Sequence, residues 1–293
     1  MSDTHPQRHR KGYLDGDPDS HTRNVPACLA IGIRHEEEGD DRVAARLEWG
    51  GAMQCAGRAS RGAILVLADH LLGTAIFSTL PEPRPMSTMS MRLDWLAPAM
   101  PGMSMVARAA RVVRNEDQAF VRIEVTDESG GAVAEVVGQF HLNGMPGGGR
   151  VEDRKADRQR FAHVGPFMAG DFEAYLDLQS RNDGYVFQAV DRHVGTRSLP
   201  AVHGGVVAAA LEAAALRVAS RAGHGWGRNS HFDFLRPVIS DRPTFIDVQS
   251  VRIGRAASVL TVSGWQDSPE RPVTVARVLA GHHPVGEMVE TRF

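Results

Sequence analysis

The sequence has 293 residues, of which 42% are hydrophobic and 23% are charged, and its formal net charge is −2. This composition is ordinary for a globular protein, and the length suits two domains of about 100–150 residues each. So small a net charge gives no general attraction to nucleic acid or to an anionic membrane, and we expect neither as a partner. No apolar run in the sequence approaches the roughly 20 residues that a membrane span requires.

The two cysteines and the N-terminus indicate a cellular compartment. Cys28 and Cys55 are too few for a disulfide framework, and the polar N-terminus has no apolar signal region. We therefore expect a cytoplasmic protein. The His, Cys and acidic residues show none of the spacings of known metal-binding motifs, so no metal site is predicted.

Two segments divide the chain. Residues 1–27 are rich in His, Arg, Asp and Pro and are expected to form a flexible arm. Residues 144–160 begin with glycines and continue with charged residues, which is typical of a linker. We therefore expect one domain at 28–143 and a second domain at 161–293.

Each domain is expected to contain the same series of elements: two strands, a long apolar helix, a strand that ends in a proline, and three further strands. In the first domain the helix is expected at 60–77 and the strands at 29–35, 42–49, 89–98, 105–114, 119–127 and 132–142. In the second domain the helix is expected at 203–220 and the strands at 174–179, 184–190, 229–237, 244–253, 258–267 and 273–283. Asn182-Asp183-Gly184 predicts a tight turn between the first two of these strands.

These elements predict an α+β fold that has been duplicated. The strands alternate apolar and polar residues, which is typical of an antiparallel sheet with one buried face. Asp69 and Glu212 lie 143 positions apart, and Asp94 and Asp233 lie 139 apart, so the offset between the halves is nearly constant. We expect the two sheets to pair edge to edge into one continuous sheet, because this covers exposed strand edges.

One acid interrupts each apolar helix. Asp69 lies within SRGAILVLADHLLGTAIF, and Glu212 lies within HGGVVAAALEAAALRVAS. Aspartate is a poor residue in the middle of a helix, and an unpaired buried carboxylate costs several kcal/mol or shifts its pKa. A chain that places such an acid once in each half is expected to use it.

These motifs resemble the hotdog-fold acyl-CoA thioesterases, and in particular the group typified by the phenylacetate-degradation enzyme. That group has His-Gly-Gly, a helix, and an acid nine positions after the His, as in His203-Gly204-Gly205 with Glu212. The first half keeps this spacing between Ser60 and Asp69, and the segment STMSMRLDWLAP also fits the family pattern. The resemblance implies two tandem hotdog domains, each a curled antiparallel sheet around one long helix, paired as an intramolecular pseudo-dimer.

Family members form each site between two hotdogs, so the resemblance implies composite sites in this chain. One site would combine His203, Gly204 and Gly205 of the second half with Asp69 and Thr88 of the first. Gly204 is the candidate amide donor, Gly205 the candidate substrate-binding neighbour, and Thr88 the hydroxyl that holds the acid or a water molecule. His203 as a helix cap and Thr88 as an ordinary strand residue are the structural alternatives.

The second composite site is expected to be eroded. It would combine Glu212 with the Arg61-Gly62 segment, where the His and the first Gly of the motif are missing. Its hydroxyl position, ten residues before Pro237, is Gly227. Gln54 could supply a side-chain amide in its place, and Gly62 and Gln54 are therefore candidate substrate-binding residues. The halves have lost complementary parts, as expected if one site is retained.

The chemistry implied is hydrolysis of an acyl-CoA to free CoA and a carboxylic acid. Amide groups at a helix N-terminus can stabilise the negative charge that develops on a thioester oxygen. Asp69 would act as general base or as nucleophile, and the sequence leaves both routes open. We expect no cofactor besides the CoA of the substrate, and further association into a homo-oligomer. An enoyl-thioester hydratase and a non-catalytic acyl-CoA-binding protein are the alternatives.

Overall fold

The computed structural model describes residues 25–38, 42–55, 58–80, 86–142, 163–196 and 199–283. The predicted linker and nearly all of the predicted arm lie outside the described residues. Pro26 and Ala27 were expected in the arm, but they are buried in a short helix, α2 (Pro26–Ile31). This helix also shows that the strand predicted at 29–35 is wrong in its first part. Pro26 favours the start of a helix, and Gly32 ends it with a φ of 82°.

The first half follows the predicted order of elements beyond α2. Its long helix is α3 (Arg61–Phe77), whose N-cap is Ser60. Its strands are β1 (Ile33–Glu38), β2 (Arg42–Leu47), β3 (Gln54–Cys55), β4 (Arg58–Ala59), β5 (Ser87–Trp95), β6 (Met105–Arg114), β7 (Gln118–Asp127) and β8 (Ala132–His141), and a short 3-10 helix, η1 (Gly51–Met53), precedes β3.

The second half repeats this series around α6 (Gly204–Ser220). Its strands are β9 (Leu178–Arg181), β10 (Gly184–Gln188), β11 (Val194–Thr196), β12 (Leu199–Val202), β13 (Trp226–Phe234), β14 (Pro243–Ile253), β15 (Ala257–Trp265) and β16 (Thr274–Gly281), with η3 (Asp191–His193) before β11. The hairpin predicted at Asn182-Asp183-Gly184 is confirmed, because Arg181 pairs with Gly184.

The strand predicted at 174–179 is wrong in its first part. Residues Phe172–Leu176 form a short helix, α5, and the strand β9 begins only at Leu178. The side chain of Asp171 caps this helix by accepting a hydrogen bond from the Ala174 amide, and Asp177 ends it in the left-handed region at φ 50°. These two local signals outweigh the alternation of apolar residues.

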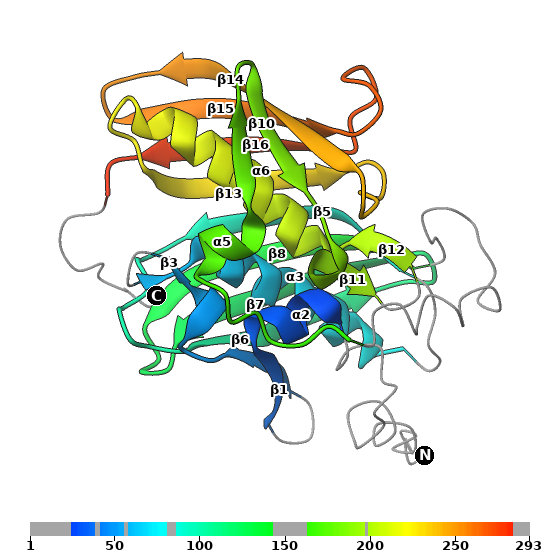
Figure 1. Ribbon diagram of the computed structural model, residues 1–293. Coiled ribbons are helices and arrows are strands. Elements are labelled where there is room, and N and C mark those ends of the chain that lie inside the picture. The colour runs from blue at the N-terminus through cyan, green and yellow to red at the C-terminus, as the bar shows by residue number, and fades with distance from the viewer. Residues whose placement is uncertain are drawn as a thin grey trace, which may run out of the picture.

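Both halves contribute to one 12-stranded sheet with the order β1-β2-β6-β7-β8-β5-β13-β16-β15-β14-β10-β9. The order in one half mirrors the order in the other, which agrees with the repeated series of elements that the sequence predicts. Strands β5 and β13 form the seam and pair antiparallel, with Met91 opposite Phe232. Figure 1 shows the two halves on either side of this seam, α3 in the lower half and α6 in the upper half.

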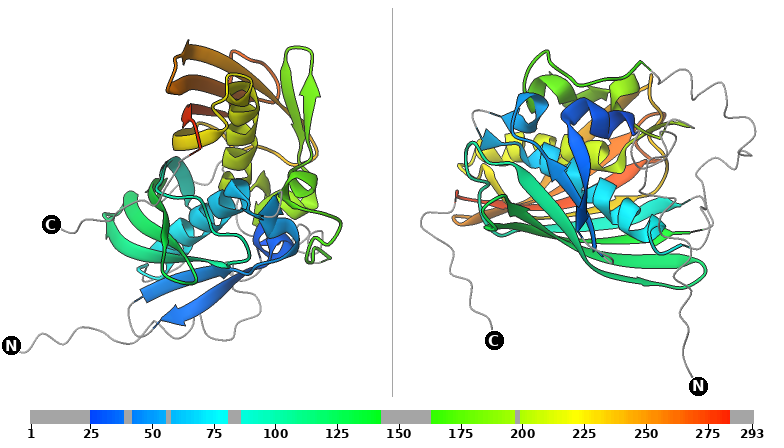
Figure 2. Two further views of the ribbon diagram at one scale, coloured as in Figure 1. Left: turned by 90° about the vertical axis from the view of Figure 1, so that its left-hand side faces the viewer. Right: turned by 90° about the horizontal axis from the view of Figure 1, so that it is seen from below.

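The two long helices lie on the same side of the curled sheet and against each other (Figure 2). Nearly every side chain of α3 from Ala63 to Ile76 is buried, which explains its apolar composition. The helices approach closely at Gly205, where an added Cβ would lie 2.6 Å from the carbonyl oxygen of Leu65 and from the Cα of Val66. The first turn of α6 therefore reaches the middle of α3 only because residue 205 has no side chain.

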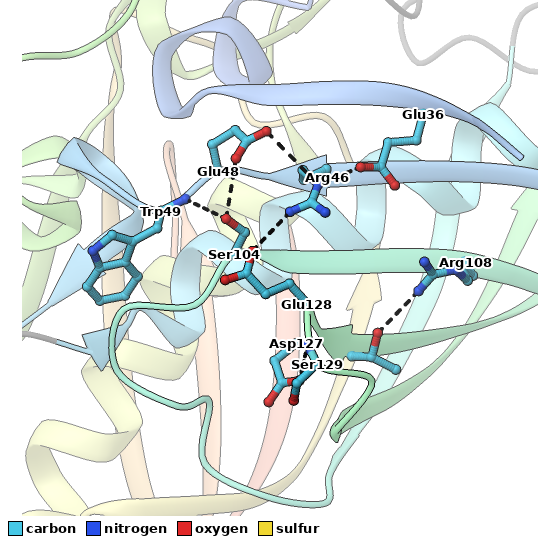
Figure 3. Close-up of polar contacts among 10 residues, drawn as sticks. Glu36, Arg46, Glu48, Trp49, Ser104, Arg108, Asp127, Glu128 and Ser129 are labelled. Atoms are coloured by element: carbon cyan, nitrogen blue, oxygen red, sulfur yellow. Dashed lines mark hydrogen bonds and ion pairs between the residues drawn. The ribbon is translucent and has the colours of Figure 1, made fainter.

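A polar network joins β1 and β2 to the rest of the first half (Figure 3). Arg46 of β2 forms ion pairs with Glu36 of β1 and, at 3.3 Å, with Glu128 beyond β7. Ser104 donates to Glu48 at 3.3 Å and accepts from the Trp49 amide at 3.1 Å. These contacts fix the outer strands of the first half, far from the seam.

We predict that Gly205→Ala lowers the free energy of unfolding by about 1–3 kcal/mol, because the new methyl group would meet backbone atoms of α3 that cannot rotate away. Urea unfolding measures this change. The control is Gly165→Ala, since an added Cβ at Gly165 has no atom within 4 Å. Equal stability of the two variants would contradict the close helix packing described above.

Candidate active site

Asp69 lies in the interior of the seam, where residues of both halves surround it. Its position in the middle of α3 leaves only 6% of its surface exposed. The amide of Gly205, at the start of α6, donates to Asp69 Oδ2 at 2.8 Å. The hydroxyl of Thr88, on β5, donates to Asp69 Oδ1 at 3.2 Å. Each carboxylate oxygen therefore has a donor, one from each half.

Gly204 lies directly beside this carboxylate. An added Cβ at Gly204 would lie 2.8 Å from Asp69 Oδ2. Because Gly204 is the first residue of α6, its N–H has no partner within the helix, and none of the other described residues accepts from it. The carboxylate and an available helix amide therefore lie side by side.

His203 is the N-cap of α6 and contacts the same carboxylate. Its Nδ1 lies 3.1 Å from the Gly205 nitrogen and 3.3 Å from Asp69 Oδ2. Its Nε2 lies 3.9 Å from Cys28 Sγ. Burial lowers the pKa of His203, although Asp69 opposes this shift, so the imidazole is neutral at pH 7.

Cys28 is unsuited to act as a nucleophile. Burial, followed by the charge of Asp69, raises the pKa of its thiol well above the ordinary value. The reactive form of cysteine is the thiolate, which these surroundings disfavour. Cys28 also lies on the side of His203 opposite to Asp69, so Asp69 is the better candidate for the chemistry.

A groove of about 460 Å³ opens beside Gly204 and Thr88. The first half contributes Met86, Ser87, Thr88, Met89 and His141, and the second half contributes Ala201, Val202, Gly204, Val207, Phe234, Leu235, Arg236, Pro237, Val238 and Thr274. The groove therefore crosses the seam, and its walls are mainly apolar. Residues of both halves can therefore contact a substrate that lies in the groove against the Gly204 amide.

The pseudo-symmetric site contains Glu212, which is held by an ion pair. Glu212 is 2% exposed, and Arg61 Nη2 donates to its Oε1 at 2.9 Å. Ser230 Oγ and Trp95 Nε1 donate to the same oxygen at 2.6 and 3.1 Å. This carboxylate is therefore bound by three side chains, whereas Asp69 lies beside an available amide.

Arg61 fills the space that is open in the Asp69 site. Its guanidinium stacks on the ring of Trp95, with 3.7 Å from Cζ to the ring centroid, and lies 4.8 Å from that of Trp226. Its Nη1 donates to the carbonyl oxygen of Gly227 at 3.0 Å. A side chain at residue 227 would collide with the guanidinium. Gly227, which has no hydroxyl to offer, thus provides the room that Arg61 occupies.

The two remaining candidates of this second site have different surroundings. Gly62 lines a pocket of about 410 Å³, and the ring of Phe172 fills the space where a side chain would begin. Gln54 lies in β3 opposite Ala59, and its neighbour Cys55 lines this pocket. The hydrogen-bond partners of Glu212 among the described residues are Arg61, Trp95 and Ser230, and Gln54 is not one of them.

Several residues near the two acids had no signal in the sequence. Cys28, His35 and His70 lie behind His203, and Trp95 and Ser230 bind Glu212. They come from strands and helices far apart in the chain, so only the packing of the elements brings them together. The sequence shows that Arg61 replaces the first glycine of the motif, but it does not show that Arg61 pairs with Glu212.

A possible set of metal ligands also lies here, although no metal site was predicted. Cys28, His70 and His203 are buried, and each offers one ligand atom within 4.8 Å of the other two.

No helix among the described residues is long and apolar enough to cross a membrane.

The comparisons with known proteins agree with this architecture. Residues 194–281 match the family model described as "Acyl-CoA thioesterase N-terminal domain". This match includes His203, Gly204 and the whole of α6, and it covers less than half of the chain. No curated protein sequence matches the chain.

Solved structures extend the likeness to most of the chain. A tesB protein of Mycobacterium avium subsp. paratuberculosis is 12% identical with a TM-score of 0.59, and the match covers 88% of this chain and 98% of that one. An acyl-CoA thioesterase II, TesB2, from Mycobacterium marinum is 12% identical with a TM-score of 0.50, covering 87% and 98%. At this identity the likeness concerns the fold. Residues 194–281 are therefore similar to a domain of acyl-CoA thioesterases, and the chain as a whole has the double-hotdog fold.

Proposed function

We propose that the protein is an acyl-CoA thioesterase with one working site, formed by Asp69 of the first half and Gly204 of the second. The proposal depends on one observation: a buried carboxylate lies beside an available helix amide at the wall of an apolar groove. The family match of residues 194–281 and the double-hotdog fold support this class of reaction. The acyl group itself is left open.

In this reaction the thioester carbonyl oxygen accepts a hydrogen bond from the Gly204 amide. The positive end of the α6 dipole and this amide stabilise the charge that develops as the carbonyl carbon becomes tetrahedral. The absence of a side chain at Gly204 lets the carbonyl approach the backbone. The mainly apolar groove then holds the acyl group or the pantetheine arm.

Asp69 activates the attack on the carbonyl carbon. As general base it removes a proton from water while the water oxygen bonds to the carbon, the carbon–sulfur bond breaks, and the proton passes to the leaving thiolate. As nucleophile its oxygen bonds to the carbonyl carbon and the carbon–sulfur bond breaks, which releases the CoA thiolate and leaves a mixed anhydride that water then hydrolyses. Thr88 and Gly205 hold the carboxylate oxygens in either route, which leaves both routes open.

Glu212 has no comparable role in this proposal. Its charge is neutralised by Arg61, and the guanidinium fills the space beside it. A substrate carbonyl would have to displace a buried, paired cation to reach this carboxylate. We therefore assign Glu212 and Arg61 a structural role.

We predict that Asp69→Asn lowers kcat for acyl-CoA hydrolysis by about 10²–10⁴-fold, the usual contribution of a positioned general base. The asparagine keeps the size of the side chain, so urea unfolding should show a folded protein. A panel of acyl-CoAs is assayed for loss of the thioester and release of free thiol. Glu212→Gln is the matched control and should keep kcat within about twofold.

Other outcomes of this assay would reject parts of the assignment. Thiol release that Asp69→Asn leaves unchanged would exclude Asp69 as the catalytic acid. Addition of water to an enoyl thioester without thiol release would favour the hydratase. Binding of every acyl-CoA without turnover would favour a non-catalytic protein.

We also predict that Arg61→Met lowers the free energy of unfolding by about 3 kcal/mol, because it leaves the buried carboxylate of Glu212 without its cation. The double variant Arg61→Met/Glu212→Gln should recover most of this loss, since it removes the charge as well. Both variants should still hydrolyse thioesters at 25 °C. Stability is measured in urea, and kcat is measured on the folded fraction. Loss of hydrolysis in the double variant would place the working site at Glu212.

A further inference from the structure

Three soft or borderline metal ligands converge behind the catalytic aspartate. Cys28 comes from α2, His70 from α3, and His203 from the N-cap of α6. The exposed fractions of their surfaces are 3%, 6% and 6%. Three unconnected elements thus place a thiol and two imidazoles in one buried cluster, which we call the Cys28 cluster.

The distances in the Cys28 cluster are close to those of a zinc site. Zinc binds sulfur at about 2.3 Å and imidazole nitrogen at about 2.0 Å with tetrahedral geometry, so its ligands lie roughly 3.3–3.8 Å apart. Cys28 Sγ and His203 Nε2 are already 3.9 Å apart, and the atoms of all three residues lie within 4.8 Å of one another. The separations therefore exceed those between zinc ligands by at most about 1.5 Å.

The two histidines of the cluster have surroundings typical of metal ligands, whereas the buried Cys28 is a thiol that must release its proton when a metal binds. Burial, together with the neighbouring His35 and His203, lowers the pKa of His70, so its imidazole is neutral. His35 Nε2 lies 3.1 Å from His70 Nε2. His203 has Asp69 beside its other nitrogen, at 3.3 Å from Nδ1. A carboxylate behind a ligating histidine is the usual second layer of a metal site, because it orients the ring.

We propose that Cys28, His70 and His203 form an inhibitory binding site for a thiophilic divalent cation, with zinc as the preferred ion. A thiol and imidazoles select zinc over magnesium or calcium, which prefer oxygen ligands. On binding, the Cys28 sulfur bonds to the metal as a thiolate and its proton passes to solvent.

The inhibition follows from the position of His203. A cation on Nε2 of this ring is separated from Asp69 by a single imidazole. Its positive charge attracts the negative carboxylate, so the Asp69 oxygens attack a proton of water or the carbonyl carbon less readily. The ring would also be fixed on the metal, beside the first turn of α6. The inhibitory effect rests on the proposed hydrolysis at Asp69, whereas metal binding itself does not.

Cobalt binding tests the site without reference to activity. The full chain is titrated with Co²⁺, which substitutes for zinc, and the thiolate-to-cobalt charge-transfer band is recorded in the near ultraviolet. We expect the band in the wild-type protein and its loss on competition with Zn²⁺. Cys28→Ala should abolish the band, and Cys55→Ala, the other cysteine of the chain, is the matched control that should keep it.

Either of two results would overturn this site: no band in the wild-type protein, or a band that Cys55→Ala abolishes. If Cys28→Ala does not fold, His70→Asn replaces it, and this variant should weaken binding of Co²⁺ at least about tenfold. An unchanged Co²⁺ affinity in His70→Asn would remove His70 from the site.

Inhibition is tested by following the thioester absorbance with and without Zn²⁺ in each variant. We expect zinc to slow the wild-type and Cys55→Ala proteins roughly tenfold or more, and EDTA to restore their rates. The ratio of the two rates should be close to one in Cys28→Ala. Any capture of zinc by the released CoA thiol affects all variants equally. Cobalt binding without inhibition would reject the inhibitory role, and absence of hydrolysis in every protein would instead reject the proposed function.

Discussion

The hydrogen bond from the Gly205 amide to Asp69 holds the candidate site together across the seam. It joins the start of one central helix to the middle of the other, so the carboxylate of the first half and the helix dipole of the second act at the same point. The bond requires the two helices to approach within backbone contact, and residue 205 permits this because it is glycine. The edge pairing of β5 with β13 fixes the same relation on the side of the sheet. A change in either contact would separate the carboxylate from the Gly204 amide.

The two halves differ in what lies beside the buried acid: free space in one half and a positively charged side chain in the other. In the Asp69 site, Gly204 leaves room for a substrate carbonyl and Thr88 supplies a hydroxyl. In the Glu212 site, Arg61 occupies the room and Gly227 accommodates it. A buried carboxylate must be paired or strongly hydrogen-bonded, and each site meets this requirement in a different way. Only the first way leaves a carboxylate beside an available amide, as the proposed hydrolysis requires.

The thiol of Cys28 and the imidazoles of His35 and His70 lie behind His203, and they have no part in the proposed hydrolysis. Two polar environments therefore meet at this ring, the carboxylate at Nδ1 and the thiol at Nε2. A histidine in this position links the orientation of Asp69, the proposed catalytic acid, to whatever binds behind the ring. The Cys28 cluster thus offers a route by which a cation could act on the site without entering the substrate groove.

The sequence by itself determined the two long helices, most strands and the repeated order of elements, because local physics converts periodicity directly into helices and strands. The pairing of Asp69 with the His203-Gly204 segment was expected only from the resemblance to the hotdog thioesterases. The strands predicted at 29–35 and 174–179 were wrong in their first parts, because Pro26 and Asp171 favour the start of short helices within these apolar segments. Only the tertiary structure decided that Arg61 neutralises Glu212 and that Cys28 and His70 stand behind His203. Side chains so distant in the chain meet through packing of whole elements, and no local pattern encodes such a contact.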